Sequence, residues 1–289
     1  MKIINKFSDY LKANEKSENT IKSYQYDLNS FAKWFLKTNN EKFNLDKITP
    51  TDLRLYKKQL IAENKKAKTI NRRLASMKAF ITWSVQVKKI KYNISIPKNI
   101  KEVKVGFQWL NRLEQNELQR KVEQSGNKRN IAIVKVLLNT GLRVRELCEL
   151  TWDLITISDR KGKVIVKLGK GGKTREIPLN KDCRNAFLNI GYADNIGKEE
   201  RIFKGQRGNL TPRGVQLMLK RVVQQSSNLR NITPHQLRHS FCKNLVDMGI
   251  GLEKVAFLAG HESLDITKVY CKPSFNDLQE AVELIGEEE

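Results

Sequence analysis

Residues 233–239 read Thr-Pro-His-Gln-Leu-Arg-His, the start of a helix that carries titratable and cationic side chains. Threonine is a common N-cap and proline is favoured at the first helical position, so we expect the helix to begin at Pro234. His235 and Arg238 are three positions apart and therefore share one helix face. All three histidines of the chain lie between residues 235 and 261. Such clustering of groups that titrate near neutral pH is typical of proton-transfer sites.

Further short motifs precede and follow this helix. Asn139-Thr140-Gly141-Leu142-Arg143 places an arginine just beyond a glycine that can end a helix, and Glu146 follows three positions later. Gly260-His261 follows an apolar helix, and Tyr270 comes nine residues after it. Each motif alone is compatible with ordinary packing or a solvated surface, and a lone tyrosine usually packs. Their occurrence together, in this order, indicates one site.

The first hundred residues show the periodicity of amphipathic helices. Apolar residues recur at spacings of three and four from Ile21 to Phe35 and again from Ile70 to Ile81, which places each set on one helix face. Asn19-Thr20 is a candidate cap for the first of these helices. Shorter helices are expected near residues 4–11 and from Thr49-Pro50 onward. This pattern predicts a small helical bundle.

The sequence also predicts a second domain with a different composition. Residues 93–107 are rich in lysine and lack a helical period, so they are expected to link a domain at 1–92 to one at 108–289. In the second domain, residues 163–168 and 175–179 are expected to be strands joined by a glycine-rich turn. Helices are expected around them. The predicted fold class is mainly α with a small antiparallel β-sheet in the second domain.

The glycine-rich turn invites a nucleotide-binding interpretation that its spacing excludes. Gly172-Lys173-Thr174 matches the end of a P-loop, but the position that requires the first glycine holds Lys167. A P-loop also opens a helix, whereas this turn joins two strands. The lysines of the turn are either solvated or inserted into a DNA groove. Zinc is also disfavoured, because the four cysteines are scattered and no His-Glu-x-x-His motif is present.

The charge of the chain indicates a polyanionic partner. Lysine and arginine number 54 against 31 acids, a formal charge of +23. Residues 277–289 hold six acids and no base, so residues 1–276 carry +29. The sequence pI is about 9.9, which favours nucleic acid. Membrane surfaces also attract bases, but we find no lipidation motif, signal peptide or apolar run long enough to span a bilayer. We expect a cytoplasmic protein associated with the nucleoid.

Taken together, the motifs closely resemble those of the tyrosine recombinase (phage integrase) family, which includes stand-alone chromosome-dimer recombinases, Cre-like enzymes and transposon-encoded resolvases. The resemblance covers the second domain through its arginine, hairpin-lysine, histidine and tyrosine motifs, and the first domain resembles the core-binding domain of the family. It implies a two-domain clamp around DNA. It also implies strand cleavage through a 3′-phosphotyrosine link and a Holliday junction, without metal, ATP or another cofactor.

The resemblance assigns a role to each motif. Tyr270 matches the nucleophile, and Arg143, Arg238 and His261 match the groups that hold the scissile phosphate, for which arginine forks are suited. His235 matches the residue that helps to take the tyrosine proton. The remaining assignments are a buttress at Glu146, a structural histidine at His239, and a hairpin lysine that protonates the leaving 5′-oxygen, either Lys170 or Lys173.

DNA contacts and assembly are further implications. Besides Lys173, the candidates for DNA contact are Arg72 and Arg73, which fall on other faces of the helix at 70–81. Residues 277–286 combine an apolar stripe with acids, and this helix either covers its own core or, as the family favours, joins protomers into a homotetramer on two sites. A helical DNA-binding protein without chemistry and a monomeric type IB topoisomerase are the rival classes. Target sequence, accessory proteins and biological task are open.

Overall fold

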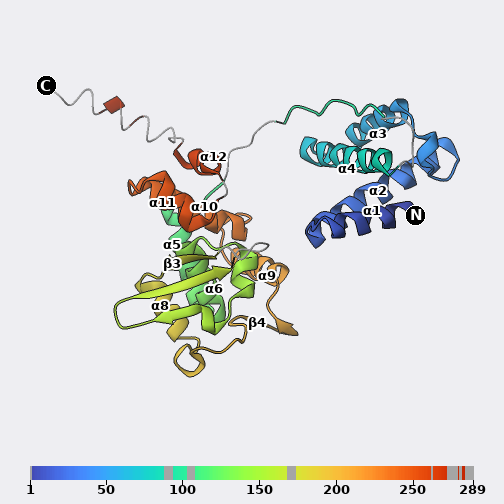
Figure 1. The fold of residues 1–289 in the computed structure, drawn as a ribbon. Helices are drawn as coiled ribbons and strands as arrows, with labels where there is room; N and C mark the ends of the chain where they lie inside the picture. Colours follow the sequence, from blue (N-terminus) through green and yellow to red (C-terminus); the bar gives the residue numbers. More distant parts are fainter. Residues whose placement is uncertain are drawn as a thin grey trace. The chain divides into compact units, whose positions relative to one another are not determined.

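The computed structural model describes residues 2–87, 94–102, 108–167, 174–261, 263–271, 279 and 282–283. The chain divides into two compact units, Met1–Val105 and Gly106–Glu289 (Figure 1). Helices dominate the described residues of both units, and short antiparallel strands occur in the second. The predicted fold class, mainly α with a small antiparallel sheet, is confirmed.

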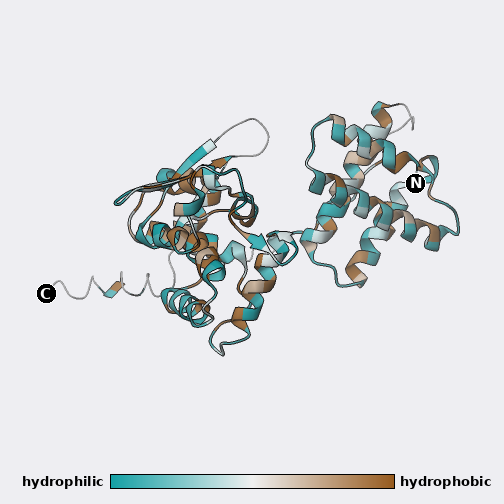
Figure 2. Cartoon of the chain, turned by 90° about the horizontal axis from the view of Figure 1, so that it is seen from below, coloured by the Kyte–Doolittle hydropathy of each residue, from teal (hydrophilic) through white to brown (hydrophobic). Residues whose placement is uncertain are grey.

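The N-terminal unit packs the apolar faces of its helices into one core. The elements described are α1 (Lys2–Ala13), α2 (Glu18–Asn39), the 3-10 turn η1 (Leu45–Lys47), α3 (Pro50–Ala62) and α4 (Ala67–Gln86). Both predicted stripes face the core. The buried residues are Ile21, Leu28, Phe31 and Phe35 on α2, where Tyr24 is partly buried, and Ile70, Leu74, Met77 and Ile81 on α4. Figure 2 shows hydrophobic and hydrophilic residues interspersed along these helices, as expected when one face of each is buried.

Capping residues set where these helices begin. Thr49 caps α3, as the Thr-Pro motif predicts, and it also exchanges hydrogen bonds with Asp52 in a capping box. The cap expected at Asn19-Thr20 is wrong. Ser17 caps α2 instead, because its extended backbone lets its hydroxyl accept a hydrogen bond from the Thr20 amide at 3.2 Å. Thr20 thus lies inside the first turn.

Part of the expected linker packs against the N-terminal unit. Ile94 is buried in the core of this unit. The side-chain amide of Asn71 donates to the Ile100 carbonyl at 2.9 Å and accepts from the Ile100 amide at 2.8 Å. This pair of bonds imitates the pairing of two strands, so residues 94–102 are held to α4 by more than apolar contact.

The second unit combines helices with a small sheet, of which one face is buried and the other is partly or fully exposed. Its helices are α5 (Arg112–Gln124), α6 (Lys128–Thr140), α7 (Val144–Glu149), α8 (Lys181–Leu188), α9 (Pro212–Val223), α10 (Pro234–Asp247), α11 (Leu252–Ala259) and α12 (Leu264–Lys268). Its strands are β1 (Ile155–Ile157), β2 (Gly162–Lys167), β3 (Thr174–Pro178), β4 (Lys204–Gly205) and β5 (Gly208–Asn209). The 3-10 turns are η2 (Trp152–Leu154), η3 (Ala193–Asn195) and η4 (Val269–Cys271).

The sheet confirms the predicted β2–β3 pair and extends it. Its order is β1-β2-β3, all antiparallel, and the β2–β3 register pairs Val166 with Arg175 and Lys167 with Thr174. Sequence reasoning missed β1 and the β4–β5 hairpin, because strands of two or three residues are too short to show a period.

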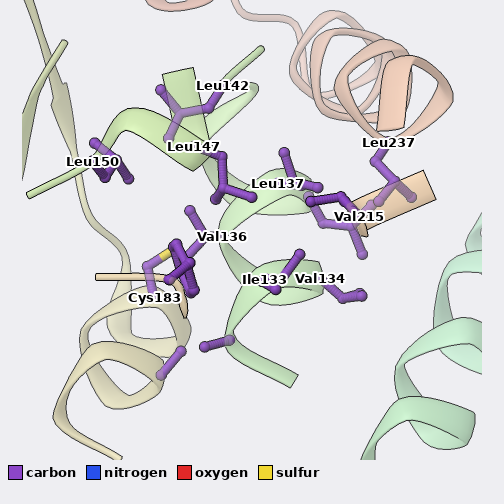
Figure 3. Packing of buried hydrophobic residues seen from close by; sticks show 14 of the residues in the cluster. Ile133, Val134, Val136, Leu137, Leu142, Leu147, Leu150, Cys183, Val215 and Leu237 are labelled. Carbon is purple, nitrogen blue, oxygen red and sulfur yellow. The ribbon is translucent and has the colours of Figure 1, made fainter. Parts of the chain in front are cut away.

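The core of this unit is built around α6. Figure 3 shows Ile133, Val134, Val136 and Leu137 of this helix between side chains that come from other elements. Cys183 of α8, Val215 of α9 and Leu237 of α10 belong to the same buried cluster. Because α6 is packed on several sides, its C-terminal end is a rigid platform for the residues that follow it.

Candidate active site

Arg143 follows directly from the end of α6. Gly141 ends this helix in the left-handed conformation, with φ of 61°. The chain then turns so that Arg143 caps α7, where its amide donates to Glu146 Oε2 at 2.7 Å. Its guanidinium donates through Nη1 to Glu146 Oε1 at 2.9 Å and through Nη2 to the Gly260 carbonyl at 2.7 Å. With 39% of the side chain exposed, Arg143 is both fixed and accessible to an anion.

Arg238 approaches the same place from α10. The predicted start of this helix is confirmed: Thr233 is the N-cap, and Pro234 occupies the first turn. Arg238 is buried and donates through Nη1 to the Gly141 carbonyl at 2.5 Å. Burial, together with repulsion from Arg143, lowers the pKa of Arg238 to about 10, so it stays cationic at neutral pH.

Glu146 holds a second arginine that sequence reasoning did not identify. Arg175 donates through Nη1 and Nη2 to the two carboxylate oxygens at 3.0 and 2.8 Å, and through Nε to the Leu258 carbonyl at 3.1 Å. Burial by itself would raise the pKa of Glu146, but the hydrogen bonds and charge of Arg175, with the Arg143 donors, hold it below its usual value. The signal in the sequence was the position of Arg175 two residues before Ile177, on the buried face of β3.

His261 and Tyr270 are brought together by the end of α11 and by η4. Gly260 ends α11 with φ of 66°, and the next residue, His261, contacts Thr267 Oγ1 through Nδ1 at 2.8 Å. The His261 and Tyr270 rings are nearly parallel, with centroids 6.3 Å apart. Burial, with repulsion from Arg238 and then Arg143, lowers the pKa of His261 to about 4, so this imidazole is neutral at pH 7.

Tyr270 is fully buried, and its hydroxyl lies 2.5 Å from Nδ1 of His239. Burial raises the pKa of this phenol, and the neighbouring Cys242 raises it further. His239 was expected to be structural, packing or hydrogen bonding inside its helix; its ring instead makes this contact outside the helix, because α10 directs it at the tyrosine. The signal was its spacing, since positions 235 and 239 lie on one face of a helix.

His235 lies one turn before His239 and is exposed. The two imidazole rings stack, with centroids 5.1 Å apart and an angle of 13° between their planes. Both predicted lysines, Lys170 and Lys173, lie outside the described residues. The strands that lead to them are paired as far as Lys167 and Thr174.

The two arginines predicted to contact DNA from the N-terminal unit, Arg72 and Arg73, differ in exposure. Arg72 is 42% exposed and forms an ion pair with Asp27, whose side chain is fully buried. The Arg73 side chain is only 9% exposed and donates to Ser30 Oγ at 3.1 Å and to the Tyr56 hydroxyl at 2.9 Å. The expectation that Arg73 contacts DNA is corrected by this position, because its guanidinium is committed to the interior of the bundle.

Within the described ranges, we find no group of three or more His, Cys, Asp or Glu side chains placed to hold a metal ion. The described helices also include none that is both long and apolar enough to cross a membrane. What the site does present is a set of fixed guanidinium groups, a neutral imidazole and a phenol. Arginine forks of this kind suit the oxygens of a phosphoryl group.

Comparison with known proteins agrees with this chemistry. The phage integrase family model matches residues 108–277, and the model of the phage integrase N-terminal SAM-like domain matches residues 4–88. The chain belongs to the phage integrase family. It is a tyrosine recombinase, an enzyme of site-specific DNA recombination.

Relatives and solved structures extend over both units. Tyrosine recombinase XerC of Lacticaseibacillus casei is 30% identical, with 93% of each chain covered. The TnP I resolvase of Bacillus thuringiensis is 28% identical, with 99% of this chain and 100% of the resolvase covered. Among structures, XerH bound to a palindromic difH substrate has a TM-score of 0.75 at 22% identity, covering 98% of this chain and 84% of that one. The Tn1549 integrase in complex with circular intermediate DNA has a TM-score of 0.70 at 20% identity, with 97% and 98% covered. These structures share the fold of the tyrosine recombinase described here.

Proposed function

We propose that this recombinase binds double-stranded DNA at its recombination sites and cuts each strand by attack of Tyr270 on the scissile phosphate. The products are a 3′-phosphotyrosine link and a free 5′-hydroxyl. Arg143 and Arg238 hold the non-bridging oxygens, together with His261. The observation that carries this proposal is that two guanidinium groups, each fixed by a backbone carbonyl, converge on His261, whose ring is stacked on that of Tyr270.

The remaining roles complete the reaction. Glu146 keeps Arg143 in place and neutralises part of the charge that Arg143 and Arg175 bring together. Lys170, or Lys173 from the same turn, protonates the departing 5′-oxygen, and on family resemblance His235 helps to take the tyrosine proton. Because the energy of the broken bond is kept in the phosphotyrosine link, the reaction needs no ATP.

Assembly and DNA binding follow from charge and family. Two basic units joined by a lysine-rich segment are suited to clamp a duplex. If each protomer neutralises about 6 to 10 phosphates, the affinity for DNA should fall by roughly 10³ to 10⁵ between 50 and 200 mM salt.

Four protomers on two sites would exchange strands through a Holliday junction and be held together by the helix expected at 277–286. An enzyme of this kind acts where the DNA lies, in the cytoplasm at the nucleoid.

The test is a covalent adduct. The purified protein is incubated in EDTA with nicked DNA from the flanks of its own gene, which traps cleavage, and the mixture is run on a denaturing gel. Wild type is expected to form an adduct and Tyr270→Phe to form none. A shift in a native gel without any adduct would favour a DNA-binding protein without chemistry. Relaxation of supercoiled DNA without synapsis would favour a topoisomerase.

A further inference from the structure

The imidazole of His239 contacts the tyrosine hydroxyl. Its Nδ1 lies 2.5 Å from that oxygen, which is hydrogen-bond contact of the kind that a general base makes with the group it deprotonates. His235, to which family resemblance assigns the tyrosine proton, is exposed and stacks on the ring of His239. The contact between His239 and Tyr270 is buried, so it is made in a region of low dielectric where hydrogen bonds are strong.

The charges around His239 keep it neutral until an anion arrives. Burial lowers its pKa to about 4, with further lowering from His235 and Arg238 on its own helix. Tyr270 faces it from η4, and His261 interacts with it from the end of α11. A phosphate held by the arginines would offset part of this positive field and raise the pKa of His239. DNA binding would thus make the ring a better base at the time when it is needed.

Resting on the function proposed above, we propose that His239 takes the proton of the Tyr270 hydroxyl as the tyrosine attacks the scissile phosphate. The ring carries its own proton on Nε2, so Nδ1 accepts. The phenolic O–H bond breaks and an N–H bond forms at Nδ1. The phenolic oxygen then bonds to phosphorus while the bond from phosphorus to the 5′-oxygen breaks. That oxygen leaves with the electron pair and takes its proton from the hairpin lysine. His235 supports the imidazolium ring by stacking.

The experiment measures single-turnover cleavage with two nicked substrates. One carries the normal phosphate, and the other has sulfur in place of the bridging 5′-oxygen, so its leaving group departs without being protonated. His239→Ala is expected to slow cleavage of both substrates by about 10² to 10⁴, the range typical of general base catalysis. Added imidazole is expected to restore part of the rate. The double variant Lys170→Ala with Lys173→Ala, which removes either candidate for protonating the leaving group, should be slow only on the oxygen substrate.

Two matched variants separate proton transfer from packing. His239→Asn can place an acceptor oxygen near the position of Nδ1 but cannot hold the proton, so it is expected to be nearly as slow as His239→Ala while binding DNA normally. His235→Ala is expected to lose less rate than His239→Ala. Thermal midpoints and native-gel affinities show whether each variant is folded. If His239→Ala does not fold, the Asn variant decides alone.

Several results would overturn the assignment of the proton to His239. One is that either His239 variant cleaves as fast as wild type. Another is that the His239 variants cleave the sulfur substrate at the wild-type rate. The third is that imidazole restores the cleavage rate of His235→Ala but not that of His239→Ala. In each case wild type still forms its adduct through Tyr270, so the proposed function survives. Loss of the adduct in wild type would instead remove both proposals.

Discussion

Gly260 lies directly against the guanidinium of Arg175: a Cβ added to this glycine would be 2.7 Å from Nη1 and 2.9 Å from Cζ. The Gly260 carbonyl also accepts the hydrogen bond from Arg143 Nη2. Gly260 therefore ends α11, leaves space for the guanidinium of Arg175 and accepts a hydrogen bond from Arg143. Its missing side chain is a requirement of the site as well as of the left-handed backbone.

We predict that Gly260→Ala abolishes most strand cleavage. The added methyl would displace Arg175, which is held on both sides by Glu146 and Leu258 and has little room to move. The shift would reach Arg143 through the Gly260 carbonyl, so the cleavage rate in single turnover is expected to fall by at least tenfold. The positive φ adds roughly 1 kcal/mol or more of backbone strain.

Gly249→Ala is the matched control. Its φ is +75°, close to the +66° of Gly260, but no atom lies within 4 Å of the Cβ that would be added. This variant should lose only the stability that the backbone strain costs, measured by denaturant unfolding, and keep its cleavage rate. Equal loss of cleavage in the two variants would show that backbone strain, and not contact with Arg175, accounts for the effect.

Glu146→Gln is predicted to lower cleavage by at least tenfold, or about 1.4 kcal/mol of barrier. The carboxylate accepts hydrogen bonds from Arg143 and Arg175, and an amide would replace one of its oxygens with a donor that faces a guanidinium. Glu176→Gln is the control on β3, because Glu176 pairs with Lys163 at an exposed position. Its cleavage rate should stay within about twofold of wild type. A Glu146 variant as active as this control would contradict the buttress role.

The parts of the fold and site that depend on neighbouring residues were predicted from the sequence, whereas contacts between distant segments were missed. Helix starts at Thr49 and Thr233 and the helix end at Gly141 follow from capping chemistry, which a few neighbouring residues determine. Arg175 was missed because its partner Glu146 comes from another element, and periodicity shows only that the residue shares a face with an apolar neighbour. The contact of His239 with Tyr270 was missed for the same reason.

In the N-terminal unit, Asp27→Asn is predicted to destabilise the bundle by about 3 to 5 kcal/mol, because it removes the carboxylate whose Oδ1 lies 3.9 Å from Nε of Arg73 and so leaves a nearly buried guanidinium without its counter-charge. The Asp27 side chain is fully buried, and besides pairing with Arg72 it accepts a hydrogen bond from Ser76 Oγ at 2.8 Å. Asp9→Asn is the control, since the Asp9–Lys12 pair is exposed and should contribute less than about 1 kcal/mol. Urea unfolding of the full chain measures both, and equal losses would refute the prediction.

Stability is predicted to decrease as pH falls from about 6.5 to about 4. Unfolded histidine takes up a proton near pH 6.5, whereas burial holds the pKa of His239 and of His261 at about 4 in the folded chain. Between these values the unfolded state binds more protons, so the free energy of unfolding rises with pH in this window. Below about pH 4 the folded histidines also bind protons and this dependence ends. Thermal midpoints measured from pH 4 to 7.5 should show a smaller decrease in His239→Asn than in wild type. Parallel curves for the two proteins would mean that His239 is protonated as easily in the folded as in the unfolded chain.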